Sequence, residues 1–208
     1  MRKILFAALL VLSFNAAKSQ ILAWNFDADV KGNERTSLST YNDPNLEVSI
    51  LSRGPGINAE KATLSFASAF PVNLTKEEAI KAGAYYQFTV RPREGYQAAL
   101  ETLNVILRAQ PNAPKQYRWM YSTDGIKFIN LGKGDVKIKT TVNNGIAQPT
   151  LDLSLYEDLK NITSDQTIVF RLYAWGGTEG SKQNGFRIGK SNPSAHALSV
   201  SGKVFKQK

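Results

Sequence analysis

The chain has 208 residues, with 26 Lys and Arg against 17 Asp and Glu, which gives a formal net charge of +9 at pH 7. It contains no cysteine, and this excludes disulfides, thiol catalysis and cysteine-ligated zinc. The basic residues are spread along the chain without a Lys/Arg block, so the charge pattern does not indicate a nucleic-acid-binding protein.

Residues 1–19 have the three-part pattern of a secretory signal peptide. Arg2 and Lys3 give a positive start, residues 4–12 are an uninterrupted apolar run, and Ala17 and Ser19 supply small side chains at the exit. The apolar run is too short for a membrane span, which needs about 20 residues. We expect cleavage before Gln20, one domain over residues 20–208 with no membrane span, and a location that is secreted, periplasmic or in the cell envelope.

Short apolar runs separated by turn residues follow along almost the whole mature chain, a pattern typical of a β-sandwich or barrel. Asp124-Gly125 between two such runs predicts a hairpin. The predicted strands are 21–26, 46–51, 62–66, 85–91, 100–108, 116–122, 127–131, 135–142, 150–153, 167–175, 185–188 and 197–205. We therefore expect an all-β fold of two antiparallel sheets in a jelly-roll-like sandwich.

One segment, residues 73–83, has a helical pattern. Thr75 is followed three residues later by Glu78, which is the spacing of a capping box, and Gly83 is a suitable stop. This predicts one short helix near residues 75–82, with Asn73 or Thr75 as its cap.

Strand alternation predicts a face that is rich in arginine. In the predicted strand 167–175, Arg171, Tyr173 and Trp175 share one face, and Phe170 and Leu172 point to the other. Four predicted strands each carry one arginine opposite their more apolar side: Arg108, Arg118, Arg171 and Arg187.

If these strands are neighbours, the four arginines, Tyr173 and Trp175 form one outer sheet face suited to carboxylates, sulfates or sugar rings. We name these six residues as candidate ligand-binding residues. The alternative is structural, because each arginine can lie over apolar neighbours or pair with a nearby Asp or Glu. Sequence alone does not give the strand order on which the choice depends.

Signals for catalysis or metal binding are weak. The only histidine, His196, lies beside Pro193 and Ser194 and is expected in a turn. A hydrolase needs only two carboxylates, but nothing selects a pair among Glu94, Glu101, Asp124 and Asp152. We therefore name no catalytic residue, no metal ligand and no cofactor, and leave open a calcium ion held by carboxylates of the early loops, such as Asp27, Asp29 or Asp43.

Several segments, taken in order, carry a family resemblance: 22–26, 84–90 with Pro92, Gly95 and Tyr96, 121–125, 169–176, 186–188 and 198–202. They resemble the secreted, jelly-roll-like β-sandwich domains of Bacteroidetes and of PEP-CTERM-sorted exported proteins. The chain has Gly189 where such domains often carry an Asp, and it ends without a PEP-type motif. The resemblance implies an extracellular or envelope protein, with carbohydrate binding or adhesion as the usual role.

Together these observations predict a secreted, non-enzymatic module that binds a glycan or another surface polymer. Two alternatives stay open. The first is a structural or adhesion protein that docks on envelope or extracellular proteins, and the second is a carboxylate-based polysaccharide hydrolase.

Overall fold

The structure is a computed structural model that describes residues 19–27, 29–138, 145–179, 184–189 and 196–207. It contains two antiparallel sheets that pack face to face, one α-helix and one 3₁₀ turn, η1 (Glu157–Leu159). This confirms the predicted all-β sandwich with one short helix. The predicted signal peptide lies outside the described residues, except for Ser19, and β1 begins at Gln20.

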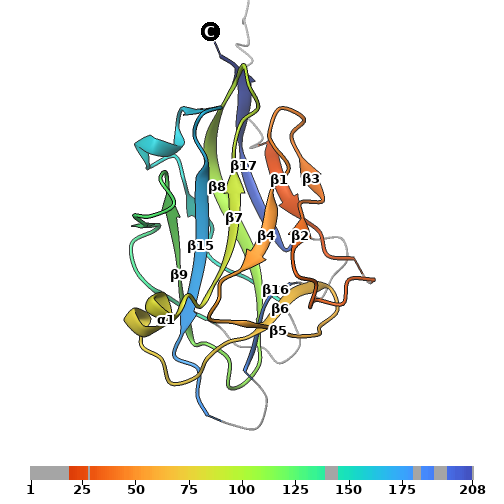
Figure 1. Cartoon of the computed structure of the whole chain (residues 1–208), viewed down its shortest axis with the longest axis vertical. Coiled ribbons are helices and arrows are strands. Elements are labelled where there is room, and N and C mark those ends of the chain that lie inside the picture. The colour runs from red at the N-terminus through yellow and green to blue at the C-terminus, as the bar shows by residue number, and fades with distance from the viewer. Residues whose placement is uncertain (1–18, 28, 139–144, 180–183, 190–195, 208) are drawn as a thin grey trace, which may run out of the picture.

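Sheet I has the strand order β3-β1-β17-β8-β16-β6-β5, and β12, β13 and β14 also pair with β8. Its strands are β1 (Gln20–Trp24), β3 (Tyr41–Asn42), β5 (Asn58–Ala59), β6 (Ser65–Ala69), β8 (Tyr96–Ala109), β12 (Ile146–Ala147), β13 (Leu151–Asp152), β14 (Ile162–Thr163), β16 (Gly185–Gly189) and β17 (Leu198–Lys206). The long strand β8 is the centre of this sheet (Figure 1), since β16 and β17 follow one of its edges and three short strands follow the other.

Sheet II has the order β10-β9-β15-β7-β4-β2, with β11 also paired to β9. Its strands are β2 (Ser37–Leu38), β4 (Ile50–Arg53), β7 (Tyr85–Val90), β9 (Gln116–Ser122), β10 (Ile129–Asn130), β11 (Val136–Lys137) and β15 (Ile168–Trp175). The β9–β10 hairpin was predicted from Asp124-Gly125. Its turn is long, and Asp124 accepts hydrogen bonds from the backbone N–H groups of Ile126 and Lys127.

Several predicted strands are shifted or shortened. Leu46 forms only an isolated bridge to Pro92, and the strand expected over 46–51 is β4, Ile50–Arg53. The strand expected over 62–66 runs from Ser65 to Ala69. Of the strand expected over 135–142, the structure describes Val136–Lys137, and residues 139–142 lie outside the described part. The strand from Ser65 starts late because Leu64 adopts a left-handed conformation, at φ 55°, which an extended strand does not accommodate.

Helix α1 (Lys76–Ala82) has the capping box that the sequence predicts. The Thr75 hydroxyl accepts from the Glu78 backbone N–H, and the Glu78 carboxylate accepts from the Thr75 backbone N–H at 2.8 Å. Gly83 closes the helix in the left-handed conformation, at φ 69°. The helix packs on β15 at one end of sheet II (Figure 1).

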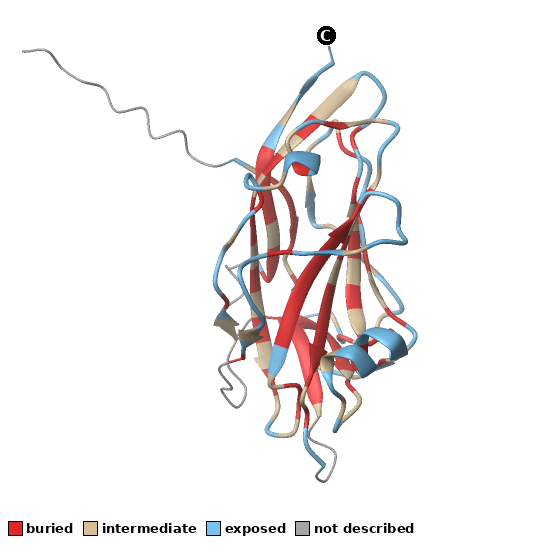
Figure 2. Ribbon diagram, turned by 90° about the vertical axis from the view of Figure 1, so that its left-hand side faces the viewer, coloured by how far each residue is buried: buried red, intermediate tan, exposed pale blue. Residues whose placement is uncertain are grey.

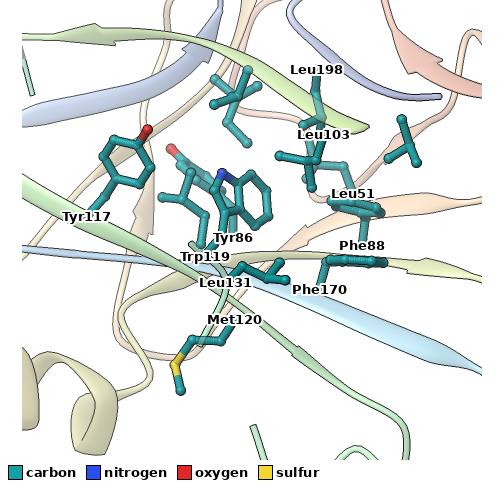
Figure 3. Packing of buried hydrophobic residues seen from close by; sticks show 14 of the residues in the cluster. Leu51, Tyr86, Phe88, Leu103, Tyr117, Trp119, Met120, Leu131, Phe170 and Leu198 are labelled. Atoms are coloured by element: carbon teal, nitrogen blue, oxygen red, sulfur yellow. The ribbon is translucent and has the colours of Figure 1, made fainter. Parts of the chain in front are cut away.

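The inner faces of the two sheets form one hydrophobic core (Figure 2), which includes the buried tryptophans Trp24 and Trp119. Phe88 and Phe170 from neighbouring strands of sheet II stack with their ring centroids 4.9 Å apart. Figure 3 shows these two rings below Leu103 and Leu198, which come from sheet I. Side chains of both sheets therefore build the core.

A charged side chain crosses this core. Arg53 of β4 in sheet II donates to the Ala67 carbonyl and the Ser68 hydroxyl of β6 in sheet I, and its guanidinium lies 3.7 Å from the Phe66 ring centroid. Burial lowers the pKa of Arg53, and electrostatic interactions with Tyr86 and Glu34 oppose that shift. Arg53 thus links the two sheets by bonds that apolar packing alone does not provide.

Candidate functional site

The four arginines predicted to share one face are divided between the two sheets. Arg118 and Arg171 belong to β9 and β15 of sheet II, whereas Arg108 and Arg187 belong to β8 and β16 of sheet I. The single arginine face is therefore not formed. Alternation correctly places each arginine opposite the core, but it does not determine which strands become neighbours.

Arg118 is buried and is held within the protein through its Nε and Nη1 atoms. Its Nε donates to the Asp135 carboxylate at 2.8 Å, and its Nη1 donates to the carbonyl oxygens of Leu131 and Gly132 at 3.1 and 3.2 Å. Lys76 of α1 pairs with the same carboxylate at 2.8 Å. The structural alternative raised by the sequence therefore describes Arg118 better than ligand binding does.

Arg171 lies between two aromatic rings. Its guanidinium carbon is 4.2 Å from the Tyr85 ring centroid and 4.1 Å from that of Phe128. Its Nε donates to the Gln87 side chain at 2.7 Å, and Nη1 donates to the Tyr173 hydroxyl at 3.2 Å. Phe128, from the β9–β10 turn, thus covers the guanidinium that the sequence predicted to be open to a ligand.

Tyr173 and Trp175 are both buried, so neither offers an open ring face for a sugar. Tyr173 packs edge-on against Tyr85, with ring centroids 5.1 Å apart. Trp175 lies beneath Lys76 of α1, whose Nζ is 5.6 Å from a ring centroid of Trp175. Helix α1 and the β9–β10 turn therefore cover much of the face on which the sequence placed its ligand.

On sheet I, Arg108 and Arg187 are brought together. They are directly opposite one another in the β8–β16 pair. Arg108 donates to the Thr63 carbonyl at 2.9 Å, and Arg187 lies 3.7 Å from the nearest carboxylate oxygen of Glu60. Two of the six predicted residues thus form a cross-strand pair on the outer face of sheet I, the orientation that alternation predicts for each of them.

The carboxylates considered for catalysis have local structural roles. Asp124 caps the β9–β10 turn, Asp152 accepts from the backbone and hydroxyl of Ser154, and Glu101 lies 4.0 Å from Lys203. In the described ranges, no group of three or more Asp, Glu or His side chains is placed to hold a metal ion. His196 is exposed.

A hollow of about 350 Å³ lies on the outer face of sheet I, and we call it the polar hollow. Every residue that lines it carries a hydroxyl or an amide, and none is charged. The lining residues are Gln20, Thr102, Asn104, Thr150, Ser199 and Ser201. They come from β1, β8, β17 and the segment before β13, so segments distant in sequence build one surface.

Two β-bulges form this hollow, one on each side of Ser201. In the β1–β17 pair, Gln20 is opposite Ser201 but Leu22 is opposite Val200, so Ile21 is the extra residue. In the β8–β17 pair, Thr102 is opposite Ser201 but Leu100 is opposite Gly202, so Glu101 is extra. A β-bulge interrupts the regular hydrogen bonding between two strands and changes the direction of nearby side chains. Such bulges often occur beside functional sites.

Gly202 allows the second bulge. A Cβ at this position would collide with the Ala99 carbonyl oxygen, so a larger residue cannot lie there without moving the backbone. The bulge also reverses which face of β8 is buried. Ala98 and Leu100 point to the core before it, and Leu103 and Val105 do so after it. Thr102 and Asn104 are consequently on the outer face.

The polar side chains of the hollow are connected to each other. Thr150 donates its hydroxyl to the Asn104 side-chain oxygen at 2.6 Å, and Asn104 donates its amide to the Thr102 hydroxyl at 3.4 Å. The hydroxyls of Thr102 and Ser201 are also hydrogen-bonded. This network fixes the orientation of the groups before any ligand arrives, while hydroxyl oxygens keep further acceptor capacity.

Sequence reasoning missed the polar hollow, although part of the signal is present. The apolar positions of β8 change phase between Leu100 and Leu103, which indicates a bulge. The two serines of β17, at 199 and 201, alternate with buried Leu198 and Val200. What the sequence does not provide is the pairing that places β1, β8 and the Thr150 segment around Ser201.

Comparison with known proteins gives little further guidance. No protein-family model matches the chain, and no curated protein sequence matches it. Among solved structures, the C-terminal domain of a chitobiase from Bacteroides fragilis aligns over 84% of this chain and 98% of that domain, with 11% identity and a TM-score of 0.34. A TM-score this low does not establish a shared fold. The resemblance to exported β-sandwich domains therefore stays a prediction.

Proposed function

We propose that the protein is a non-catalytic binding module that holds a neutral portion of a glycan in the polar hollow. The observation that carries this proposal is the lining, in which six uncharged hydroxyl or amide side chains surround one hollow. Sugars present alternating donors and acceptors, and hydroxyl and amide groups can satisfy both. The volume of about 350 Å³ lies in the range of small-ligand sites.

The location of the hollow supports a polymeric ligand. It lies on an outer sheet face, where Thr150 is exposed and Asn104 and Ser199 are half-buried. A chain of sugars can therefore cross the strands with its ends free. The predicted signal peptide would bring the protein outside the cytoplasm, where such polymers occur, and we include export in the proposal.

Asn104 is the residue to change first, because it joins Thr150 to Thr102 in the network. The purified protein would be screened on a glycan array at low and at moderate salt, and hits would be measured by isothermal titration calorimetry. We expect Asn104→Ala to weaken binding by roughly tenfold or more, the effect of removing one or two hydrogen bonds. Binding that does not depend on salt would fit the uncharged lining.

Asn130→Ala is the matched control, since Asn130 is an exposed amide on β10 of sheet II. Both variants should retain the wild-type thermal unfolding temperature within a few degrees. If Asn104→Ala binds as the wild type does, or if the array shows no neutral-glycan binding at either salt, the polar hollow is not a glycan site.

A second candidate, docking on another protein, has one specific observation in its favour. Leu38 of the edge strand β2 is opposite Ile50 of β4, and the two residues are 61% and 46% exposed. Apolar side chains at an unpaired sheet edge favour association with another chain. Sedimentation at increasing concentration tests this alternative, and a Leu38→Lys variant should abolish any association that uses the edge.

A further inference from the structure

Two like charges are directly opposed on the outer face of sheet I. Arg108 of β8 and Arg187 of β16 are cross-strand partners, between the pairs Leu107–Ile188 and Ala109–Phe186. Opposed like charges on neighbouring strands destabilise a sheet, so this arrangement needs compensation. Burial lowers the pKa of Arg108, and the charge of Arg187 lowers it further.

The compensation available from the described residues is incomplete. The nearest oxygen of Glu60, Oε2, lies 3.7 Å from an Arg187 Nη2, which is beyond hydrogen-bond distance. That Glu60 oxygen and the Nε atoms of both arginines are buried without a hydrogen-bond partner in the described part of the chain. The side chain of Arg187 is only 10% exposed. The Glu60 carboxylate therefore lies near Arg187 without a hydrogen bond to it, and Arg108 has the Thr63 carbonyl as its acceptor.

The backbone around the pair is shaped to hold these side chains. Gly185 and Gly189 lie on either side of Arg187 along the same face of β16, and Ala67 lies opposite it on β6. A Cβ at Gly185 would collide with the Glu60 carboxylate and lie 3.1 Å from Arg187 Nη2. The absence of a side chain at Gly185 thus leaves room for the Glu60 carboxylate and the Arg187 guanidinium.

We infer that Arg108 and Arg187 bind an anionic group, a carboxylate or a sulfate, carried by the same glycan whose neutral part occupies the polar hollow. The inference rests on the proposed function, and it narrows the ligand class to an acidic polysaccharide. Guanidinium groups present planar forks that match both anions. An anion between the arginines supplies the acceptor that Glu60 does not reach.

The two places are connected by β8. Asn104 in the hollow and Arg108 in the pair lie on the same face of this strand, four residues apart. In an extended strand this is about 13 Å. A glycan of a few sugar units that lies along β8 can therefore occupy both places.

The test compares matched acidic and neutral ligands by titration calorimetry at constant ionic strength. One pair is an oligogalacturonate and its methyl ester, and the other is a sulfated galactan oligosaccharide and its desulfated form. We expect the wild type to prefer one acidic form, and Arg108→Gln and Arg187→Gln to remove that preference. The expected loss for the acidic form is roughly ten- to a hundredfold in affinity.

Arg171→Gln is the matched control, because it removes the same charge from a half-buried arginine on sheet II. It should keep the acidic preference. Arg187→Lys retains the positive charge but lacks the planar guanidinium that donates two hydrogen bonds to one anion. This variant serves as the test if Arg187→Gln does not fold. It should bind the acidic form more weakly than the wild type does. The preferred pair, galacturonate or sulfated galactan, identifies the anion as carboxylate or sulfate.

The outcomes separate this inference from the proposed function. Equal affinity for acidic and neutral forms, with binding still lost in Asn104→Ala, overturns the arginine site and leaves the hollow in place. An acidic preference that Arg171→Gln also removes shows a net-charge effect, and it overturns the inference too. An acidic preference that survives Asn104→Ala, with no neutral binding, supports the arginine pair and contradicts the hollow.

Discussion

On sheet II, Arg118 and Arg171 have hydrogen-bond partners or aromatic rings against their guanidinium groups. On sheet I, Arg108 and Arg187 are opposite one another, and their buried Nε–H groups have no hydrogen-bond partner among the described residues. All four arginines occupy equivalent outward positions in their strands. The loops that contact these arginines supply different side chains on the two sheets. The β9–β10 turn and the segment that follows bring Phe128 and Asp135 over sheet II, while the loop before β6 brings only Glu60 and a carbonyl over sheet I.

The regularity of the sheets differs as well. The β15–β7 and β15–β9 pairs of sheet II run without a register shift, but both pairs that β17 forms in sheet I contain one. We propose that the regular, covered face of sheet II serves stability and that the bulged face of sheet I presents polar groups to a ligand. The predictions below test that division, from the largest expected effect to the smallest.

Replacing Arg118 should destabilise the protein most. Arg118→Met removes the donor to Asp135 and to the carbonyls of Leu131 and Gly132, and it leaves these acceptors poorly satisfied. We expect a loss of about 3 kcal/mol in the free energy of unfolding, measured by urea denaturation. Glycan affinity of the folded fraction should be unchanged. A loss below the error of the measurement would contradict a structural role.

Gly202→Ala tests the bulge. The added Cβ collides with the Ala99 carbonyl oxygen, so the bulge must shift, and we expect a loss of about 2 kcal/mol together with weaker glycan binding. Gly134→Ala is the control, since a Cβ there meets nothing within 4 Å. Urea denaturation and calorimetry provide both readouts. If Gly202→Ala retains wild-type stability and affinity, the bulge does not shape the hollow.

Arg171→Met should have a smaller effect than Arg118→Met. The guanidinium is half-buried, and the methionine side chain can replace part of its contact with the Tyr85 and Phe128 rings. We expect a loss of about 0.5–1 kcal/mol by urea denaturation and no change in glycan affinity. Abolished binding would instead restore Arg171 as a ligand-binding residue, as the sequence predicted.

Asp135 should add a small acid-sensitive contribution to stability. Burial raises the pKa of Asp135, but hydrogen bonds and charges from Lys76 and Arg118 outweigh it, so the pKa lies below its usual range. This stabilisation is present above the unfolded pKa of about 3.9 and is lost as pH falls through the lower folded value. The stability difference between wild type and Asp135→Asn should therefore shrink as pH falls from about 5 toward 2. A constant difference over that range, measured by thermal unfolding, would rule out the ion pairs as its source.

Local rules predicted much of the fold. The capping box of Thr75 and Glu78 fixes α1, and period-2 alternation locates β7, β9 and β15 within one or two residues, because their neighbours in sequence carry the signal. The short edge strands β2, β5 and β12 were missed, since two residues show no period.

The site was less predictable, because it depends on pairing between distant segments. The face of each arginine follows from its own strand, but the pairing of Arg108 with Arg187 requires β8 and β16 to be neighbours. Likewise, Trp175 lies against Lys76, which is 99 positions earlier in the sequence. The phase change of β8 and the alternating serines of β17 are the local signs of the hollow.

The placement of β17 also constrains when the protein can fold. This last strand lies between β1 and β8, so it joins the first strand of the domain to the central one. Until β17 has been synthesised, β1 cannot pair through it with the rest of sheet I, and residues 96–105 of β8 lack this neighbouring strand. Domains rich in such distant contacts fold slowly. Sheet I can therefore be completed only after β17 has been synthesised, and in that interval a chaperone can engage the unpaired strands.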